Sequence, residues 1–187
     1  MAETGYLTNQ FLIAMPMLQD PNFFHSVIYV CEHNQHGAMG IVINQPVDLT
    51  LGELVEQMGH QPPDNELATH PIYRGGPVDS ERGFVLHRPM GDWQATMPVG
   101  SNIGITTSND IIEAMANGNG PEDFLVALGY AGWGPGQLEE EIRENSWLNG
   151  PMAPELLFGA GTEECWQAAV ALIGVDIHQL SGNVGHA

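Results

Sequence analysis

The sequence predicts a compact, mixed α+β fold, and three observations lead to this prediction. Hydrophobic residues make up 43% of the 187 residues, which is enough for a substantial core in one domain or in two intimately packed subdomains. The chain contains 23 Gly and 13 Pro, so it must turn often, and many short elements are favoured over a few long helices. Stretches typical of strands and of helices follow one another irregularly, unlike the regular repeat of a doubly wound parallel sheet.

The first elements of the chain are predicted to be strands. Residues 11–15 are apolar and end at Pro16. Residues 27–30 and 38–43 are β-rich runs on either side of a polar, Gly-ended loop, which is the pattern of a β-hairpin. Both runs are almost continuously apolar, so we expect the hairpin to be buried on both faces.

The middle of the chain is predicted to contain two helices and two strands, each bounded by a cap or turn residue. In chain order they are a helix over 51–58 capped by Thr50, strands over 71–74 and 83–87 joined by Gly75-Gly76-Pro77-Val78, and a helix capped by Ser108 that runs to Ala116.

The last third contains the best candidate for a central strand, the apolar run Phe124–Tyr130. A glycine loop over 132–136 and a helix over 137–145 are expected to follow it. The sequence then predicts a short strand over 156–158 and a final helix, capped by Thr162, that runs to Ile173.

The charge balance argues against several classes of partner. The chain has 23 acidic residues, four Arg and no Lys, giving a formal net charge of −19. Binding to a phosphate backbone requires clustered cations, so we expect neither direct nucleic-acid binding nor attachment to anionic membranes. Two explanations of the acidity stay open: a solvated, self-repelling surface, or adaptation to high salt, which predicts a melting temperature that rises with salt.

A cytoplasmic location is expected from what the sequence lacks. The apolar runs are too short to cross a bilayer, and the N-terminus has no basic region of the kind that begins a signal peptide. The two cysteines, Cys31 and Cys165, are far apart and do not form a disulfide framework, which favours a reducing compartment.

One segment has residue types that can bind a metal, namely Cys31-Glu32-His33-x-x-His36. Its spacing matches no strong zinc signature, and the second cysteine is remote. We therefore favour an exposed polar turn and predict no metal and no cofactor.

The glycine loop before the 137–145 helix is a candidate anion site, because a helix N-terminus can hold a phosphate. The phosphate-loop pattern needs a lysine that this chain does not have, and Glu139, Glu140 and Glu141 would repel a phosphate. A tight turn with Trp133 as a packed anchor is the simpler interpretation.

A second candidate anion site comes from the arginines. Arg74, Arg82 and Arg88 lie within fifteen positions of one another, and His87 is next to Arg88. Arginine can bind a carboxylate or phosphate through two parallel hydrogen bonds, so these residues would form an anion site if they converged. The alternative is ordinary ion pairing with the many carboxylates.

A third candidate site surrounds the same helix. Gln137 and Glu141 are one helical turn apart, and Trp133 and Trp147 flank the helix, so the four could line a cleft. Packing of both tryptophans in the core is the alternative. The sequence contains no known local signature of a catalytic site.

Blocks spread in order over nearly the whole chain resemble the AlgH/YqgE family of bacterial proteins. They are Phe11-Leu12-Ile13-Ala14-Met15-Pro16, His33-x-x-x-Gly37-Ala38-Met39-Gly40, Val42-Ile43-Asn44-x-Pro46, Gly75-Gly76-Pro77-Val78, Gly83-Phe84-Val85-Leu86-His87, Leu128-Gly129-Tyr130-Ala131-Gly132-Trp133, Gly136-Gln137-Leu138-Glu139-x-Glu141, Trp147-Leu148 and Gly185-His186-Ala187. The resemblance implies a single domain over residues 1–187, an α+β fold with a bifurcated, barrel-like sheet and flanking helices, and a cytoplasmic location. It also implies a label as a transcriptional regulator linked to alginate production, with no established DNA-binding motif and no catalytic residues to transfer.

Two functional hypotheses follow. The first is a non-enzymatic regulatory protein that acts through a protein partner or a small ligand rather than by direct DNA binding. The second is an enzyme or binding protein for a small anionic molecule that uses the Arg74–Arg88 segment. A homodimer is a common state for soluble bacterial proteins, but no residue marks an interface.

Overall fold

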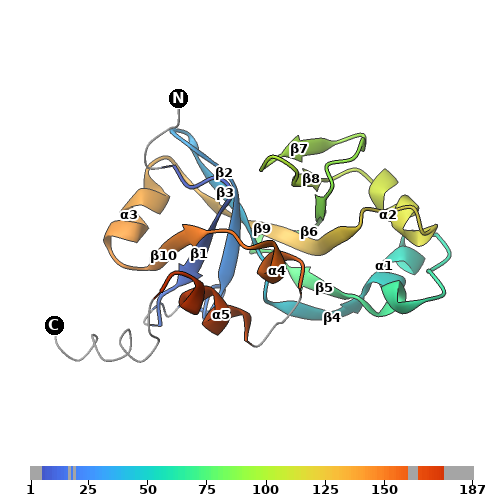
Figure 1. Ribbon diagram of the computed structural model, residues 1–187, viewed down its shortest axis with the longest axis horizontal. Helices are drawn as coiled ribbons and strands as arrows, with labels where there is room; N and C mark the ends of the chain where they lie inside the picture. Colours follow the sequence, from blue (N-terminus) through green and yellow to red (C-terminus); the bar gives the residue numbers. More distant parts are fainter. Residues whose placement is uncertain (1–5, 17, 19, 160–163, 175–187) are drawn as a thin grey trace.

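The computed structural model describes residues 6–16, 18, 20–159 and 164–174, and its ten strands belong to one sheet (Figure 1). The strands are β1 (Gln10–Ala14), β2 (Val27–Asn34), β3 (Gly37–Val42), β4 (Pro46–Thr50), β5 (Pro71–Arg74), β6 (Val78–Arg88), β7 (Thr96–Pro98), β8 (Gly104–Thr106), β9 (Asp123–Trp133) and β10 (Trp147–Pro151). The helices are α1 (Leu51–Gln57), the 3₁₀ helix η1 (Glu66–Thr69), α2 (Asp110–Ala116), α3 (Gln137–Arg143), α4 (Pro154–Leu157) and α5 (Cys165–Leu172).

The long strand β9 divides the sheet into two halves. The strand order is β10-β1-β2-β3-β9-β6-β8-β7, and β5, paired with β4, also joins β9. The end of β9 pairs with β3, and its beginning pairs with β5 and β6. We call the β10-β1-β2-β3 part the first half-sheet and the β4, β5, β6, β8 and β7 part the second half-sheet. The predicted α+β fold with a bifurcated sheet and flanking helices is confirmed.

The segment between β5 and β6 crosses over β9. Tyr73 of β5 and Phe84 of β6 both pair with Ala127, so β5 and β6 lie on opposite edges of β9. The connection passes so close to β9 that a Cβ atom on Gly76 would lie 2.1 Å from the carbonyl carbon of Tyr130. Gly76 also has φ +157°, so glycine is required here for both reasons.

The core is thickest around the first half-sheet. Residues Val27–Cys31 of β2 are at most 2% exposed, and Gly40–Val42 of β3 are buried as well. Ala38 and Met39 are only half-buried, so the prediction of a hairpin buried on both faces is confirmed except at the start of β3. One face packs against α4 and α5, and the other against Leu138 of α3. The second half-sheet packs against α1 and α2 through a separate apolar cluster that includes Leu51, Val55 and Ile111.

Most predicted helices are confirmed, but one cap was assigned wrongly. Thr50 caps α1 in a complete capping box with Glu53. α2 begins one residue later than predicted, with Asn109 at the N-cap position. The Ser108 hydroxyl donates to the Asp110 carboxylate and accepts from the Ala95 amide, so it links β7 to α2 instead of capping the helix.

The C-terminal third differs most from the prediction. Gly132 and Trp133 belong to β9 rather than to a glycine loop, because β3 pairs with them. The predicted strand over 156–158 is wrong: Pro154 starts helix α4 there, in line with the preference of proline for the first helical turn. The edge strand β10 was not predicted. The predicted cap Thr162 lies outside the described residues, and α5 runs to Leu172.

None of the described helices is long and apolar enough to cross a membrane.

Candidate functional site

A groove of about 710 Å³ lies between the two half-sheets. In Figure 1 it lies between the β2–β3 hairpin and the β7–β8 hairpin, with β9 and β6 beneath it. Its lining is mainly apolar and aromatic, and comes from six strands and the segments next to them. The lining residues are Glu32, Ala38, Met39, Val78, Arg82, Phe84, Ala95, Thr96, Met97, Ile105, Thr107, Tyr130, Gly132 and Trp133.

Only two fully charged side chains line this groove, Glu32 and Arg82. The Arg82 guanidinium carbon lies 5.4 Å from the centre of the Phe84 ring, a cation–π distance. The Phe84 ring in turn meets the Tyr130 ring edge to face, with centroids 5.7 Å apart. The three side chains therefore form one continuous polarisable surface inside the groove.

Behind the groove wall, a buried hydrogen-bonded chain leads to His87. Its Nδ1 lies 3.0 Å from the Pro89 carbonyl oxygen, which can only accept, so Nδ1 carries the proton and donates. Nε2 then accepts from the Thr106 hydroxyl at 2.6 Å, and Thr106 contacts the Thr96 hydroxyl at 2.7 Å. Burial lowers the pKa of His87, against a smaller opposite effect of the bond to Pro89. Both ring nitrogens of His87 are thus engaged within the protein, and His87 does not line the groove.

The arginines of the 74–88 segment do not converge. The Arg74 Nη2 donates to the Asn22 side chain at 2.8 Å. Arg88 binds Asp123 through Nε and Nη2, and its guanidinium lies over the Phe158 ring. Arg82 and Arg88 are six residues apart on β6, so about 20 Å of strand separates them. Of the three, only Arg82 lines the groove.

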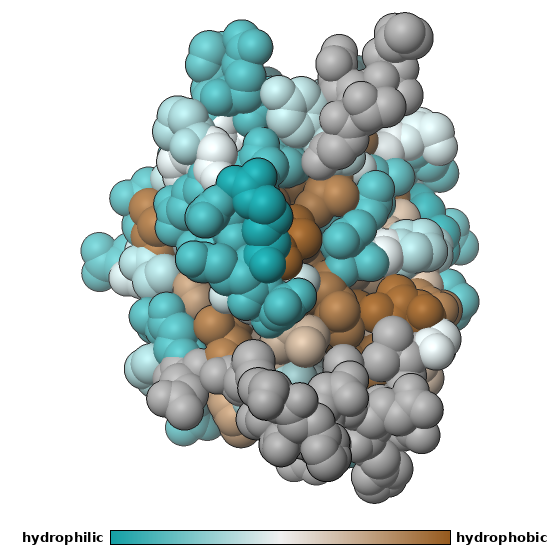
Figure 2. Space-filling view, turned by 90° about the vertical axis from the view of Figure 1, so that its left-hand side faces the viewer, coloured by the Kyte–Doolittle hydropathy of each residue, from teal (hydrophilic) through white to brown (hydrophobic). Residues whose placement is uncertain are grey.

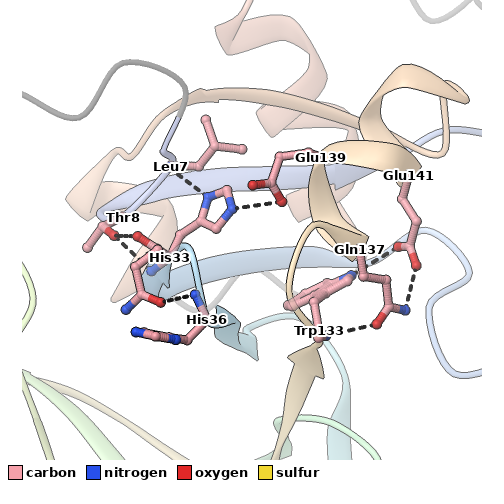
Figure 3. A network of polar contacts seen from close by, with 10 residues as sticks. Leu7, Thr8, His33, His36, Trp133, Gln137, Glu139 and Glu141 are labelled. Carbon is pink, nitrogen blue, oxygen red and sulfur yellow. Dashed lines mark hydrogen bonds and ion pairs between the residues drawn. The ribbon is translucent and has the colours of Figure 1, made fainter.

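The predicted cluster around α3 does come together, as a closed hydrogen-bonded network (Figure 3). Glu141 Oε1 accepts from the indole N–H groups of Trp133, at 3.0 Å, and Trp147, at 2.9 Å. Glu141 Oε2 accepts from the Gln137 amide, and the Gln137 carbonyl accepts from the Gly134 backbone N–H. We call these four side chains the α3 cluster. Their polar atoms bind one another and hold α3 against the sheet, and of the four side chains Trp133 alone lines the groove.

The predicted phosphate site at the start of α3 is occupied by the chain itself. The Gly134 N–H, the first amide at this turn, is bound by Gln137, and the first turn of α3 carries Glu139 and Glu140. α3 forms a hydrophilic ridge near the centre of the face shown in Figure 2. An incoming phosphate would meet carboxylates there, so the tight-turn interpretation fits the structure.

The metal-type residues of the β2–β3 hairpin point in different directions. Cys31 and His33 are buried, whereas Glu32 and His36 are exposed. His33 Nδ1 accepts from the Leu7 backbone N–H at 3.0 Å, and its Nε2 lies 3.2 Å from Glu139 (Figure 3). Burial raises the pKa of the Cys31 thiol, which disfavours the thiolate that a metal needs. Within the described residues, no group of three or more His, Cys, Asp or Glu side chains could hold a metal ion.

The sequence interpretation missed most of the groove. Of its lining residues, the sequence pointed only to Arg82, Trp133 and, as a residue type that can bind a metal, Glu32. Met39, Met97, Ile105 and Tyr130 are ordinary apolar residues of strands, and their shared exposure depends on how the two half-sheets diverge. The one usable signal was Gly132, a small residue next to large aromatic ones at the end of a strand.

Comparisons with known proteins give a consistent result. A family model described as AlgH-like matches residues 11–178. A UPF0301 protein of Thioalkalivibrio sulfidiphilus is 57% identical over 187 residues, covering all of both chains. A UPF0301 protein of Nitrosococcus oceani is 50% identical over 182 residues, or 97% of each chain.

Solved structures agree with this result. The solution structure of the AlgH protein from Pseudomonas aeruginosa matches with a TM-score of 0.81 and 45% identity, over 97% of this chain and 96% of that one. The crystal structure of protein DIP2367 from Corynebacterium diphtheriae matches with a TM-score of 0.75 over 97% of this chain and 94% of that one, and its 18% identity supports the fold alone.

Proposed function

Since this chain belongs to the AlgH-like family, and since its two half-sheets enclose an apolar groove, we propose that it is a non-enzymatic binding protein whose groove takes up an apolar part of a partner. The observation that carries the proposal is the groove itself, about 710 Å³ in volume and lined by Met39, Phe84, Met97, Tyr130 and Trp133. Binding sites are typically concave and mainly apolar, with a few placed polar groups, and they fall in this range of volume.

The titratable groups of the groove support binding over catalysis. Glu32, Arg82 and Tyr130 are the titratable side chains among the described lining residues, and no His, Cys, Ser or Asp joins them. Nucleophilic and acid–base catalysis need a nucleophile beside a base, or an acid and a base with separated pKa values. The groove offers neither pair.

A role in transcriptional regulation fits this proposal only through a protein partner. The chain carries four Arg and no Lys against 23 acidic residues, and two of the arginines are engaged with Asn22 and Asp123. Direct DNA binding would require a cluster of free cations to displace counterions. We therefore propose a cytoplasmic protein that acts on another protein.

One observation favours a second candidate function, the binding of a small molecule with an apolar body and one anionic group. The Arg82 guanidinium lines the groove and lies over Phe84, and no ion pair is recorded for it in the part of the chain that the structure describes. This candidate uses Arg82 alone, since Arg74 and Arg88 have partners elsewhere.

Photo-crosslinking in living cells tests the main proposal. A benzophenone amino acid would replace Met97 in the groove and, as the control, Leu172, an exposed apolar residue of α5 that does not line the groove. We expect discrete protein adducts from position 97 that disappear when Val78→Asp is added, and none of the same mass from position 172. The same adducts from both positions would overturn the proposal.

A thermal-shift screen with alkyl and aryl carboxylates and phosphate esters tests the second candidate. Stabilisation that Arg82→Gln abolishes and that Arg74→Gln leaves unchanged would support it. If no compound stabilises the wild-type protein, this candidate fails.

A further inference from the structure

The edge of β9 that borders the groove has a part without a neighbouring strand. β6 pairs with this edge, and the pairing ends at Val78 opposite Tyr130. The last three residues of β9, 131–133, pair with β3 on the opposite edge. Among the described residues, no strand pairs with 131–133 on the β6 side. An unpaired strand edge of this kind is a template for the backbone of another chain.

The free edge lies at the floor of the groove. Tyr130, Gly132, Trp133 and Val78 all line it, so the end of the β6 pairing and the free edge open into the same hollow. Gly132 is exposed, and a Cβ atom built on it would lie 3.4 Å from the Tyr130 ring and 4.0 Å from Val78. The missing side chain leaves the backbone of β9 open to close approach by a ligand.

The walls offer apolar contacts on both sides of this floor. Met39 of the first half-sheet and Met97 of the second face the groove from opposite walls. Both are unbranched and adaptable, which suits a surface that accepts side chains of varied shape. An extended segment on the floor would place alternate side chains against these walls, because successive side chains of a strand point to opposite faces.

The charge around the groove favours a positively charged partner. Glu32 lines the groove, and Asp79 and Glu81 lie in the exposed bulge that follows Val78. The chain as a whole carries a formal charge of −19, which attracts cations and repels anions. Arg82 is the one cation of the described lining, and its guanidinium carbon lies 5.4 Å from the centre of the Phe84 ring, at a cation–π distance.

We propose that the groove binds an extended, basic segment of another protein, which adds as a strand to the free edge of β9 at residues 131–133. This inference rests on the proposed binding function and names its partner chemistry. Main-chain hydrogen bonds to β9 provide affinity, and the groove walls read alternate side chains, as in other cases of strand addition. The free edge spans about 10 Å, so the recognised segment is short.

The test uses synthetic peptides of defined composition on the full chain. The probes are a seven-residue peptide of alternating lysine and valine, a matched peptide of alternating glutamate and valine, and decanoate as a small amphiphilic anion. Binding is measured by calorimetry and by the NMR shifts of the amides of residues 131–133. We expect the lysine peptide to bind, its Kd to rise at least tenfold between low and high salt, and the glutamate peptide not to bind.

Backbone methylation then tests strand addition directly and does not depend on any protein variant. Two lysine–valine peptides would carry N-methyl groups on one or the other alternate set of amides. Alternate amides of a strand point to opposite edges, so only one of the two methylated peptides loses the hydrogen bonds to β9. We expect the Kd of that peptide to rise at least tenfold and the Kd of the other to stay within about twofold. Equal effects of the two methylation patterns would overturn strand addition.

A matched pair of glycine variants locates the site. Gly132→Val fills the floor of the groove, whereas Gly83→Val adds the same side chain on the neighbouring strand β6, outside the groove lining. A Cβ atom on Gly83 has no neighbour within 4 Å, and neither glycine has a positive φ, so both variants are expected to fold. We expect only Gly132→Val to abolish peptide binding; equal binding to both variants would overturn the assigned site.

The inference and the proposed function fail in different ways. If the lysine peptide does not bind while crosslinks still form at position 97 but not at 172, the inference is wrong and the proposed function stands. If decanoate binds in an Arg82-dependent manner and the peptide does not, the groove serves a small anion and the inference is also wrong.

Discussion

Trp133 belongs to two neighbouring regions, the α3 cluster and the groove, which differ in how far their polar groups are hydrogen-bonded. In the α3 cluster, the Trp133 indole N–H binds Glu141, which also holds Trp147 and Gln137. In the groove, the same Trp133 lines an open apolar hollow in which a strand edge has no partner among the described residues. The polar side chains of the cluster bind one another, whereas the strand edge at the groove has no partner strand among the described residues.

This difference separates structural residues from candidates for function. A buried polar group that is fully hydrogen-bonded makes the fold unique and has little left to offer a ligand. An exposed apolar surface beside an open strand edge gains most from a partner. The α3 cluster therefore keeps the wall of the groove in place, and the groove is the candidate for contact with a partner.

The crossing at Gly76, where the chain packs against β9 beside Tyr130, is expected to be the most sensitive position. Gly76→Ala would place a Cβ atom 2.1 Å from the Tyr130 carbonyl carbon at φ +157°. Backbone strain and overpacking together predict a loss of about 4 kcal/mol in the free energy of unfolding, measured by urea denaturation. Gly83→Ala, a strand glycine with open space around its Cβ, is the control and is expected to unfold near the wild-type midpoint. A small loss in the free energy of unfolding for Gly76→Ala would show that the crossing segment is not tightly packed against β9.

The α3 cluster is expected to come next in effect. Glu141→Leu leaves the indole N–H groups of Trp133 and Trp147 without their acceptor, which predicts a loss of about 3 kcal/mol. Glu141→Gln keeps one carbonyl acceptor for the indoles but opposes its amide to that of Gln137, so we expect a smaller loss. Thermal denaturation followed by tryptophan fluorescence measures both variants. A Glu141→Leu protein as stable as wild type would show that the α3 cluster does not stabilise the fold.

The wall of the groove is expected to respond to pH through His87. Burial lowers the pKa of His87 in the folded state below its ordinary value of 6.5, so the unfolded chain binds more protons in the window below that value. The free energy of unfolding should therefore fall as the pH decreases from about 6.5, until the folded-state pKa is reached. Urea denaturation at a series of pH values measures this slope. His87→Asn should make it shallower, and an unchanged slope would show that other groups cause it.

The smallest effect on stability is expected at the groove surface itself. Val78→Asp and Leu172→Asp each add one negative charge to an exposed apolar position, so both should change stability by no more than about 0.5 kcal/mol. Only Val78→Asp should remove the crosslinks formed at position 97, because Val78 lines the groove and Leu172 does not. Loss of stability at position 78 as large as at Glu141 would erase the distinction between the two regions.

Local signals in the sequence predicted many elements correctly. The hairpin of β2 and β3 follows from two apolar runs around a polar turn, and α1 follows from the capping box of Thr50 and Glu53. The proximity of the four side chains of the α3 cluster could also be predicted, because Gln137 and Glu141 are one helical turn apart and both tryptophans flank the same helix. These features depend on residues close together in the chain.

Non-local features were predicted less well. The three arginines are close in sequence but point to different partners, because the strand β6 that carries Arg82 and Arg88 is extended. β10 was missed because its residues, Trp147–Pro151, become a strand by pairing with β1 far away in the chain. Pro154 was a local signal for the start of α4, but the apolar residues 156–158 after it indicated a strand.

The sequence by itself determined the acidity, the small number of cations, the family and the class of fold, since each depends on composition or on ordered local patterns. Only the tertiary structure decided the site. At the groove, one edge of β9 is paired up to Tyr130 and has no neighbouring strand beyond it among the described residues, while its other edge passes from β5 to β3. Strand pairing joins residues far apart in the chain, so no local pattern could mark the place where it stops.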